Sequence, residues 1–362
     1  MARRWVKGAG LTGVGMMSGA AGLLTVAHAA ARRWQRAPDS VAPEELRMPV
    51  DVVEHVIVVS DGARIRVVEA GAGRPAPTSR PPRPPRPPIV LLHGITLSAA
   101  IWPYQLRELA DAGHRVFAFD LRGHGRSTNG RGATGSAPSK LTLERLAADV
   151  EEVLAALDLR DVVVVGHSMG GMVALLMMER DPALAAGEGR IAALALVATT
   201  ASPARGRGLP ALKELVAVGR PIFASGAGLA SRLPGPTLPA VDLAFVLARI
   251  TFGDLPSARQ VLFTGEMTSG VPVRVSAELL LEILRFDGEG VLSSIRIPTT
   301  VVVGDHDVIT PLAHARALSA GISGSELLIL RGCGHMVMLE RPEDLDEAIQ
   351  RLSRRSLGNA VA

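Results

Sequence analysis

Short runs of consecutive apolar residues alternate with longer apolar stretches of helical character along most of this chain. Consecutive apolar runs between helices predict strands of a mostly parallel sheet that helices cover on both faces. The predicted strands are Ile89–Leu92, Val116–Phe119, Val162–Val165, Ala193–Val197, Thr300–Val303 and Leu327–Leu330. Helices are expected over 102–112, 141–157 with Thr142 as a possible N-cap, 172–178, and from Pro342 onward.

Two departures from this alternation define the predicted domain boundaries. Residues 56–59 and 64–68 flank Ser60–Ala63 and predict a β-hairpin after a polar linker at 37–50. Apolar helical segments interrupted by Gly and Pro fill residues 201–290, which we interpret as a helical cap inserted into the sheet domain. The α/β core is then 51–200 and 291–356, and the predicted cap helices are 209–218, 241–250 and 275–284.

A proline-rich stretch at residues 74–88 interrupts the core, with Arg80, Arg83 and Arg86 interspersed among the prolines. This composition predicts an extended polyproline segment on the surface. A solvated insertion between two strands is favoured over a ligand for a partner protein.

The N-terminal segment is uncharged over residues 8–31, with basic residues on both sides. As a helix it would extend roughly 36 Å, which is enough to cross a bilayer core. Residues 1–36 are therefore expected to be a membrane anchor, with an export signal as the alternative because Ala27-His28-Ala29 resembles a cleavage site. A poorly ordered tail on a cytoplasmic protein stays open as a third interpretation.

Composition and charge narrow the classes of function. The chain of 362 residues is 48% hydrophobic but only 3% aromatic, so Val, Leu, Ala and Met must fill its core. The single cysteine, Cys333, excludes an intrachain disulfide. The net charge of +4 comes from six cations in residues 1–36, which contain no acid. The body therefore lacks the excess of positive charge that a nucleic-acid-binding face needs.

The candidate chemistry begins at Gly166-His167-Ser168-Met169-Gly170, between a predicted strand and a predicted helix. A serine at the apex of a sharp strand–helix turn is typical of a nucleophile elbow. The flanking glycines are expected because a β-carbon there would collide with neighbouring backbone. The alternative is a glycine-rich turn with a capping serine.

A serine nucleophile needs a base, and the base needs an orienting acid. We select His335 as the base because it follows the last predicted strand, where the carboxyl ends of parallel strands line a crevice. Asp307 is the predicted acid, since Asp305 and His306 are expected to be solvated turn residues. A metal site from these three neighbours is disfavoured because adjacent residues converge poorly on one ion.

Negative charge that develops on a substrate carbonyl needs backbone N–H donors. The N–H of Met169, directly after the serine, is one candidate, and the N–H of Ile95, in the loop after the 89–92 strand, is the other. His93 in that loop is interpreted as a buried group that holds the loop. This machinery needs no cofactor and no metal.

Together these motifs resemble the α/β-hydrolase superfamily over roughly residues 50–355. The matching pieces also include His93-Gly94 with Trp102 beyond it, Asp120–Ser127, Gly304–Asp307, Gly334-His335 and Glu340–Glu343. The resemblance implies the order nucleophile, acid, base and an esterase-like or lipase-like serine hydrolase acting on a small-molecule or lipid ester. Serine at the elbow argues against the branches that open epoxides or remove halides, which typically have aspartate there.

Two other functions fit the same motifs. One is a different reaction with the same three residues, either that of a cofactor-free perhydrolase of the haloperoxidase type or hydrolysis of a carbon–carbon bond. The other is a binding module on a membrane anchor that has lost catalysis. The substrate itself is not readable from the sequence, because specificity depends on the cap.

Overall fold

The computed structural model describes residues 39–73, 86–130, 139–202 and 248–359. The predicted N-terminal anchor or export signal, most of the proline-rich insertion and the predicted cap helix 209–218 lie outside these ranges, as does most of the predicted helix 241–250. Of the expected cap, the structure therefore describes residues 201–202 and 248–290.

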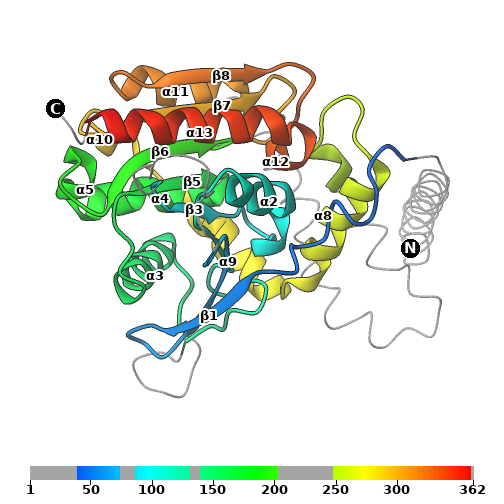
Figure 1. Ribbon diagram of the computed structural model, residues 1–362, viewed down its shortest axis with the longest axis horizontal. Helices are drawn as coiled ribbons and strands as arrows, with labels where there is room; N and C mark the ends of the chain where they lie inside the picture. The colour runs from blue at the N-terminus through cyan, green and yellow to red at the C-terminus, as the bar shows by residue number, and fades with distance from the viewer. Residues whose placement is uncertain (1–38, 74–85, 131–138, 203–247, 360–362) are drawn as a thin grey trace, which may run out of the picture.

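An eight-stranded sheet forms the centre of the protein, in the order β1-β2-β4-β3-β5-β6-β7-β8. The strands are β1 (Val53–Val58), β2 (Arg64–Ala70), β3 (Ile89–Leu92), β4 (Val116–Phe119), β5 (Val162–His167), β6 (Ile191–Val197), β7 (Thr299–Gly304) and β8 (Glu326–Leu330). Only β2 runs against the others, since its pairings with β1 and β4 are antiparallel and the remaining pairings are parallel. Figure 1 shows the edge strands β1 and β8 at opposite ends of the molecule.

Alternate residues of the central strands enter two separate hydrophobic cores, one on each face of the sheet. In β5, Val162 and Val164 belong to one core, whereas Val163 and Val165 belong to the other. Continuous apolar runs are needed because both faces of each central strand are covered. The predicted mostly parallel sheet with helices on both faces is confirmed.

The helices that cover the two faces of the sheet come from different parts of the chain. The first face carries α2 (Pro103–Asp111), α12 (Val337–Glu340) and α13 (Pro342–Asn359), with η1 (Ala99–Ile101) at its edge. The second carries α3 (Leu143–Ala156), α4 (Met169–Arg180), α5 (Pro182–Ala186), α10 (Glu289–Leu292) and α11 (Leu312–Gly321). In Figure 1, α13 and α2 lie in front of the sheet.

Local signals in the sequence placed several boundaries correctly. The predicted hairpin is the β1–β2 pair, closed by the Val59 N–H bonded to the Ala63 carbonyl at 2.9 Å. Thr142 is the N-cap of α3, where its hydroxyl accepts a hydrogen bond from the Arg145 N–H. Pro342 opens α13 as expected, because its fixed φ suits the first turn of a helix.

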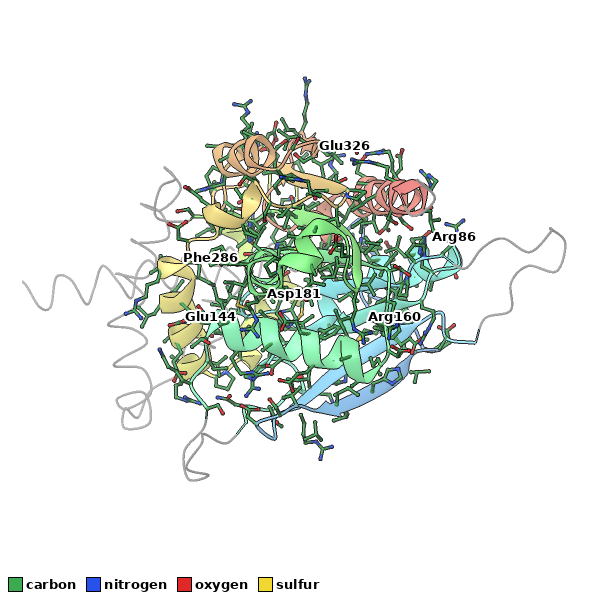
Figure 2. All side chains as sticks on the ribbon, turned by 90° about the vertical axis from the view of Figure 1, so that its left-hand side faces the viewer. Arg86, Glu144, Arg160, Asp181, Phe286 and Glu326 are labelled. Carbon is green, nitrogen blue, oxygen red and sulfur yellow. The ribbon has the colours of Figure 1, made fainter. Side chains whose placement is uncertain are left out.

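Two helices follow residue 248 within the expected cap, α8 (Ala258–Gly270) and α9 (Val273–Arg285). The predicted helix 275–284 is α9. Its residues Val275, Leu279 and Ile283 are buried against the core that α3 also faces. Figure 2 shows α9, which ends next to Phe286, beside the start of α3 at Glu144, and the two helices are in contact.

The segment expected to be a linker is packed against the body where the structure describes it. The Asp39 carboxylate accepts hydrogen bonds from the Ser257 hydroxyl and the Arg259 N–H at the start of α8. Arg107 of α2 donates to the carbonyl of Arg47. No helix within the described ranges is long and apolar enough to span a membrane.

Candidate active site

Ser168 lies at the sharp turn between β5 and α4, in a backbone conformation that side chains rarely adopt. Its φ is 52° and its ψ is −117°. A β-carbon on Gly166 would lie 2.6 Å from the Gly170 carbonyl oxygen, and one on Gly170 would lie 2.3 Å from the Leu92 carbonyl oxygen. The two glycines therefore have the steric role predicted for them, and the turn is a strained elbow with the serine at its apex.

The predicted acid and base meet directly, although they follow different strands. The Nδ1 of His335, in the loop after β8, lies 2.8 Å from Oδ2 of Asp307, in the loop after β7. Both residues are buried, with 5% and 4% of their surface exposed. A buried carboxylate at this distance fixes the imidazole in the tautomer that carries its proton on Nδ1 and leaves Nε2 free to accept one.

Hydrogen bonds keep the Asp307 carboxylate ionised despite its burial. Oδ1 accepts the N–H groups of Ile309 and Thr310, and Oδ2 accepts the Thr310 hydroxyl, each at 2.8 Å. Burial by itself raises the pKa of Asp307, but the charge and hydrogen bond of His335 and the Thr310 contacts outweigh it, so the pKa is lowered. Asp307 therefore remains an anion that stabilises a protonated His335.

Further hydrogen bonds hold the loop that carries His335. The His335 N–H donates to the Thr251 carbonyl at 2.7 Å, and the His335 carbonyl accepts from Nε2 of His167 at 3.0 Å. The Glu340 carboxylate accepts the N–H groups of Gly334 and Gly253. The base is thus tied to the elbow on one side and to residues 251–253 on the other.

Ser168 and His335 belong to neighbouring parts of this site. The structure has no hydrogen bond between the serine Oγ and the imidazole. The ring of His167, next to Ser168 in the chain, has its centroid 4.8 Å from that of His335. In a free enzyme such a bond is often long and tightens when substrate binds.

The loop after β3 brings the predicted oxyanion donor Ile95 to the elbow. A β-carbon on Gly94 would lie 3.1 Å from Cβ of Ser168, so the residue before Ile95 packs closely against the serine. Met169, the first residue of α4, lies on the other side of Ser168. Within the described residues no hydrogen-bond acceptor is assigned to the N–H of Ile95 or of Met169, so both remain open to a ligand.

The residues that the sequence analysis did not assign to catalysis have other hydrogen-bonding partners. Asp305 accepts the Gly332 N–H, and His306 contacts Asp254 at 2.8 Å, both at the surface. His93 is fully buried and binds its own loop: Nδ1 contacts the Gly94 carbonyl at 2.7 Å and Nε2 accepts the Leu121 N–H. Burial lowers the pKa of His93 to about 4, so it is neutral.

Sequence reasoning did not assign three residues that shape the site: His167, Thr310 and Glu340. Glu340 falls inside a segment already singled out, but one of its partners, the Gly253 N–H, lies in a loop distant in sequence. Thr310 bonds to Asp307, three residues before it, and only its contact with His335 depends on a distant loop. His167 stands beside the serine, and its position inside the pentapeptide was the one available signal.

The sequence profile of the family described as "alpha/beta hydrolase fold" matches residues 87–342, which is more than half of the chain. With the elbow, the acid–base pair and the sheet order, this match shows that the chain belongs to the α/β-hydrolase family.

Relatives within the family differ in their named activities. The chain is 27% identical to an AB hydrolase superfamily protein of Bacillus subtilis, over 83% of this chain and 98% of that protein. It is 29% identical to a non-heme haloperoxidase of Rhodococcus erythropolis, over 77% and 92% of the two chains. An esterase from Exiguobacterium antarcticum has a similar structure, with a TM-score of 0.65, 21% identity and coverage of 83% and 100%.

Proposed function

We propose that this protein is a serine hydrolase that cleaves carboxylic esters through an acyl-enzyme. The observation that carries the proposal is the buried His335–Asp307 pair beside the strained elbow at Ser168. A solvated structural turn would not require a serine at positive φ, two sterically obligatory glycines and an oriented imidazole at the same sheet edge.

In the first half of the reaction, Ser168 Oγ attacks the ester carbonyl while Nε2 of His335 takes the hydroxyl proton. The carbonyl oxygen becomes an oxyanion that the N–H groups of Met169 and Ile95 stabilise. When the intermediate collapses, the carbon–oxygen bond to the alcohol breaks, and the alcohol leaves with the proton from His335. The acyl group remains on Ser168.

In the second half, His335 takes a proton from water as the water oxygen attacks the acyl carbonyl. The second tetrahedral intermediate releases the carboxylic acid and returns the proton to Ser168 Oγ. Asp307 stays ionised throughout and stabilises the imidazolium that forms in each half.

Hydrolysis of p-nitrophenyl esters of increasing chain length by the wild type and by Ser168→Ala tests this proposal. Removal of the nucleophile is expected to lower kcat by about 10⁴–10⁶-fold. A fluorophosphonate probe should label the wild type and leave Ser168→Ala unlabelled. Equal ester hydrolysis by the two proteins would refute the assignment.

A second candidate is perhydrolysis, which the similarity to a non-heme haloperoxidase supports. In this reaction Ser168 condenses with a carboxylic acid to form the acyl-enzyme and release water. Hydrogen peroxide then attacks the acyl-enzyme, which releases a peroxyacid and restores the Ser168 hydroxyl. Peroxyacid formation from acetate and peroxide, measured beside ester hydrolysis, separates the two. A ratio of perhydrolysis to hydrolysis well above one would make perhydrolysis the main activity.

We also propose that residues 8–31 attach the protein to a membrane, with export as the alternative. The basis is the uncharged run between basic flanks, which lies outside the described residues. Fractionation of cells that express the full chain, or the chain without residues 1–36, tests this. Equal amounts of both proteins in the membrane fraction would contradict it.

A further inference from the structure

Two consecutive peptide groups at the candidate oxyanion site are each bonded to a histidine. The Gly94 carbonyl is bonded to Nδ1 of His93, and it belongs to the same planar peptide as the Ile95 N–H. The next peptide, between Ile95 and Thr96, has its N–H bonded to Nε2 of His124 at 3.2 Å. His124 lies in the loop after β4, 28 residues away in the chain.

The second of these peptides is where the loop needs support. Thr96 has a φ of 62°, the left-handed region that residues other than glycine rarely adopt. Such a conformation persists only where surrounding contacts maintain it. The Thr96 N–H bond to His124 is one such contact, and the Thr96 hydroxyl lies 3.3 Å from the hydroxyl of Thr268 on α8.

The bond also requires a neutral imidazole with a defined tautomer. To accept the Thr96 N–H, Nε2 of His124 must carry no proton, so the proton lies on Nδ1, which contacts the Arg122 carbonyl at 3.1 Å. His124 is 1% exposed, and burial together with the neighbouring His93 lowers its pKa to about 3. His124 therefore remains an acceptor at every pH at which an esterase is usually assayed.

We propose that His124 is a positioning residue for the oxyanion hole, acting through the Thr96 N–H to keep the Ile95 N–H directed at the substrate oxygen. This inference rests on the proposed ester hydrolysis at Ser168. His124 touches no reacting atom. It fixes one end of the Ile95–Thr96 peptide, while His93 fixes the peptide before it.

The hydrogen bond from Thr96 to His124 is therefore expected to stabilise the transition state more than the bound ester. A loop that relaxes at Thr96 moves the Ile95 N–H away from the position where the oxyanion forms, while ester binding through the rest of the site persists. Loss of one oxyanion donor costs about 10²–10³-fold in kcat, and displacement of a donor costs part of that. We expect a fall in kcat with little change in KM.

The test compares His124→Phe with His124→Gln in the full-length protein. Phenylalanine keeps an aromatic ring but offers no acceptor, so kcat should fall by about 10–100-fold with KM within about threefold of the wild type. Glutamine can place an amide oxygen near the former Nε2 and should restore most of kcat. Affinity for an alkyl boronic acid, which forms a tetrahedral adduct with a serine, should fall in parallel with kcat/KM.

His114→Phe is the matched control. His114 is also a buried histidine (2% exposed) whose Nδ1 contacts a backbone carbonyl, that of Pro87, but it lies in the loop between α2 and β4 and contacts neither Thr96 nor the elbow. The His114→Phe variant should retain the wild-type kcat, even if its thermal stability falls as much as that of the His124→Phe variant.

Three results would overturn the inference: equal kcat for His124→Phe and the wild type, equal losses for the Phe and Gln variants, or a rise in KM alone. None of these would affect the proposed hydrolysis, which the comparison of the wild type with Ser168→Ala tests separately. The two proposals are therefore separable in one set of measurements.

Discussion

Nε2 of His167 donates a hydrogen bond of 3.0 Å to the backbone carbonyl of His335, which joins the residue before the candidate nucleophile to the candidate base. The two residues are separated by 168 positions in the chain. His167 is 1% exposed, and burial together with the neighbouring His335 holds its pKa well below the usual value, so its ring is neutral. A neutral ring that donates from Nε2 has a single defined tautomer.

This relationship predicts that His167 controls the position of the base. His167→Phe removes the donor and should lower kcat by about tenfold or more, because small displacements of a catalytic group are costly. His167→Gln can present an amide N–H near the former Nε2 and should retain most of the activity. Steady-state kinetics on one ester checks both. Equal activity of His167→Phe and the wild type would show that the bond does not matter.

The strained backbone of Ser168 is predicted to lower the free energy of unfolding of the protein. Glycine adopts positive φ without the penalty of a β-carbon, whereas alanine keeps that carbon. Both Ser168→Gly and Ser168→Ala lack the hydroxyl and should be inactive. Ser168→Gly should nevertheless be more stable than Ser168→Ala by about 1–2 kcal/mol, because only glycine relieves the strain. Urea unfolding of the two variants measures the difference, and an alanine variant of equal or greater stability would argue against strain at this position.

The sequence predicted the elbow, the acid and the base as neighbours because each follows a strand of a parallel sheet. Strands that are buried on both faces give continuous apolar runs, and the polar residue after each run lies at the same sheet edge. This reasoning located Ser168, Asp307 and His335 without any contact information, and the structure brings His335 and Asp307 within hydrogen-bond distance. Their catalytic role stays a prediction.

The same reasoning could not find His124 or His167 as supporting residues. Both bond to backbone atoms, which every residue has, so no pattern of side chains marks the partner. The chain has nine histidines, and only the meeting of loops distant in sequence shows which of them hold the site. The packing of residues 39–47 against α2 and α8 was not predictable either, because their polar composition is that of a linker.

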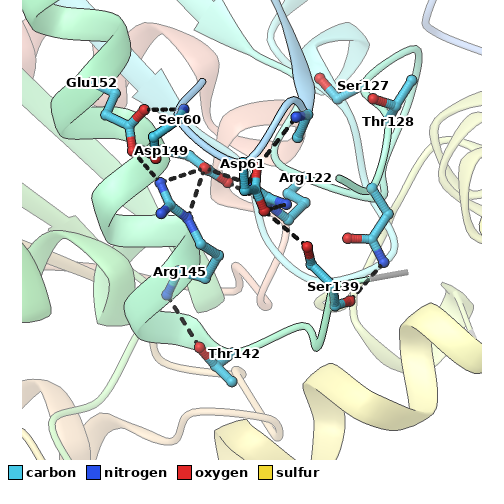
Figure 3. A network of polar contacts seen from close by, with 12 residues as sticks. Ser60, Asp61, Arg122, Ser127, Thr128, Ser139, Thr142, Arg145, Asp149 and Glu152 are labelled. Carbon is cyan, nitrogen blue, oxygen red and sulfur yellow. Dashed lines mark hydrogen bonds and ion pairs between the residues drawn. The ribbon is translucent and has the colours of Figure 1, made fainter. Parts of the chain in front are cut away.

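Arg122 shows how the loop after β4, which also carries His124, is itself fixed. Its fully buried guanidinium donates to both carboxylate oxygens of Asp149 and to both of Asp61, at 2.6–2.8 Å (Figure 3). Burial lowers the pKa of an arginine, but here the two carboxylates outweigh it and raise the pKa of Arg122. The guanidinium thereby joins the β1–β2 turn to α3.

Removal of this guanidinium is therefore expected to lower the free energy of unfolding strongly. Arg122→Met leaves Asp149, which is 2% exposed, without its main partner, and loss of one member of a buried ion pair costs about 3–5 kcal/mol. Arg160→Met is the control, because Arg160 pairs with Asp158 at the surface and exposed pairs contribute about 0–1 kcal/mol. Urea unfolding measures both. A loss below about 1 kcal/mol for Arg122→Met would mean that Arg145, which also bonds to Asp149, compensates.

Asp346 of α13 predicts a dependence of stability on pH that is separate from the active site. Asp346 is 4% exposed, and neither of its carboxylate oxygens is hydrogen-bonded to a described residue. Burial raises the pKa of Asp346 to about 7. The nearby Gln105 amide opposes the rise, without a hydrogen bond of ordinary geometry, and Glu108 and Glu343 add smaller effects in the raising direction.

Because the pKa is higher in the folded chain than in the unfolded chain, where it is about 3.9, the folded state holds its proton longer as the pH rises. The contribution of Asp346 to the free energy of unfolding then falls between about pH 4 and pH 7, by at most about 4 kcal/mol. Asp346→Asn, which stays neutral, should match the wild type near pH 4 and exceed it in stability at pH 8. Asp344→Asn, exposed on the same helix, serves as the control and should not change the shape of the profile. Unfolding in urea at several pH values measures these differences, and a wild type that gains stability relative to Asp346→Asn as the pH rises would contradict a neutral, buried Asp346.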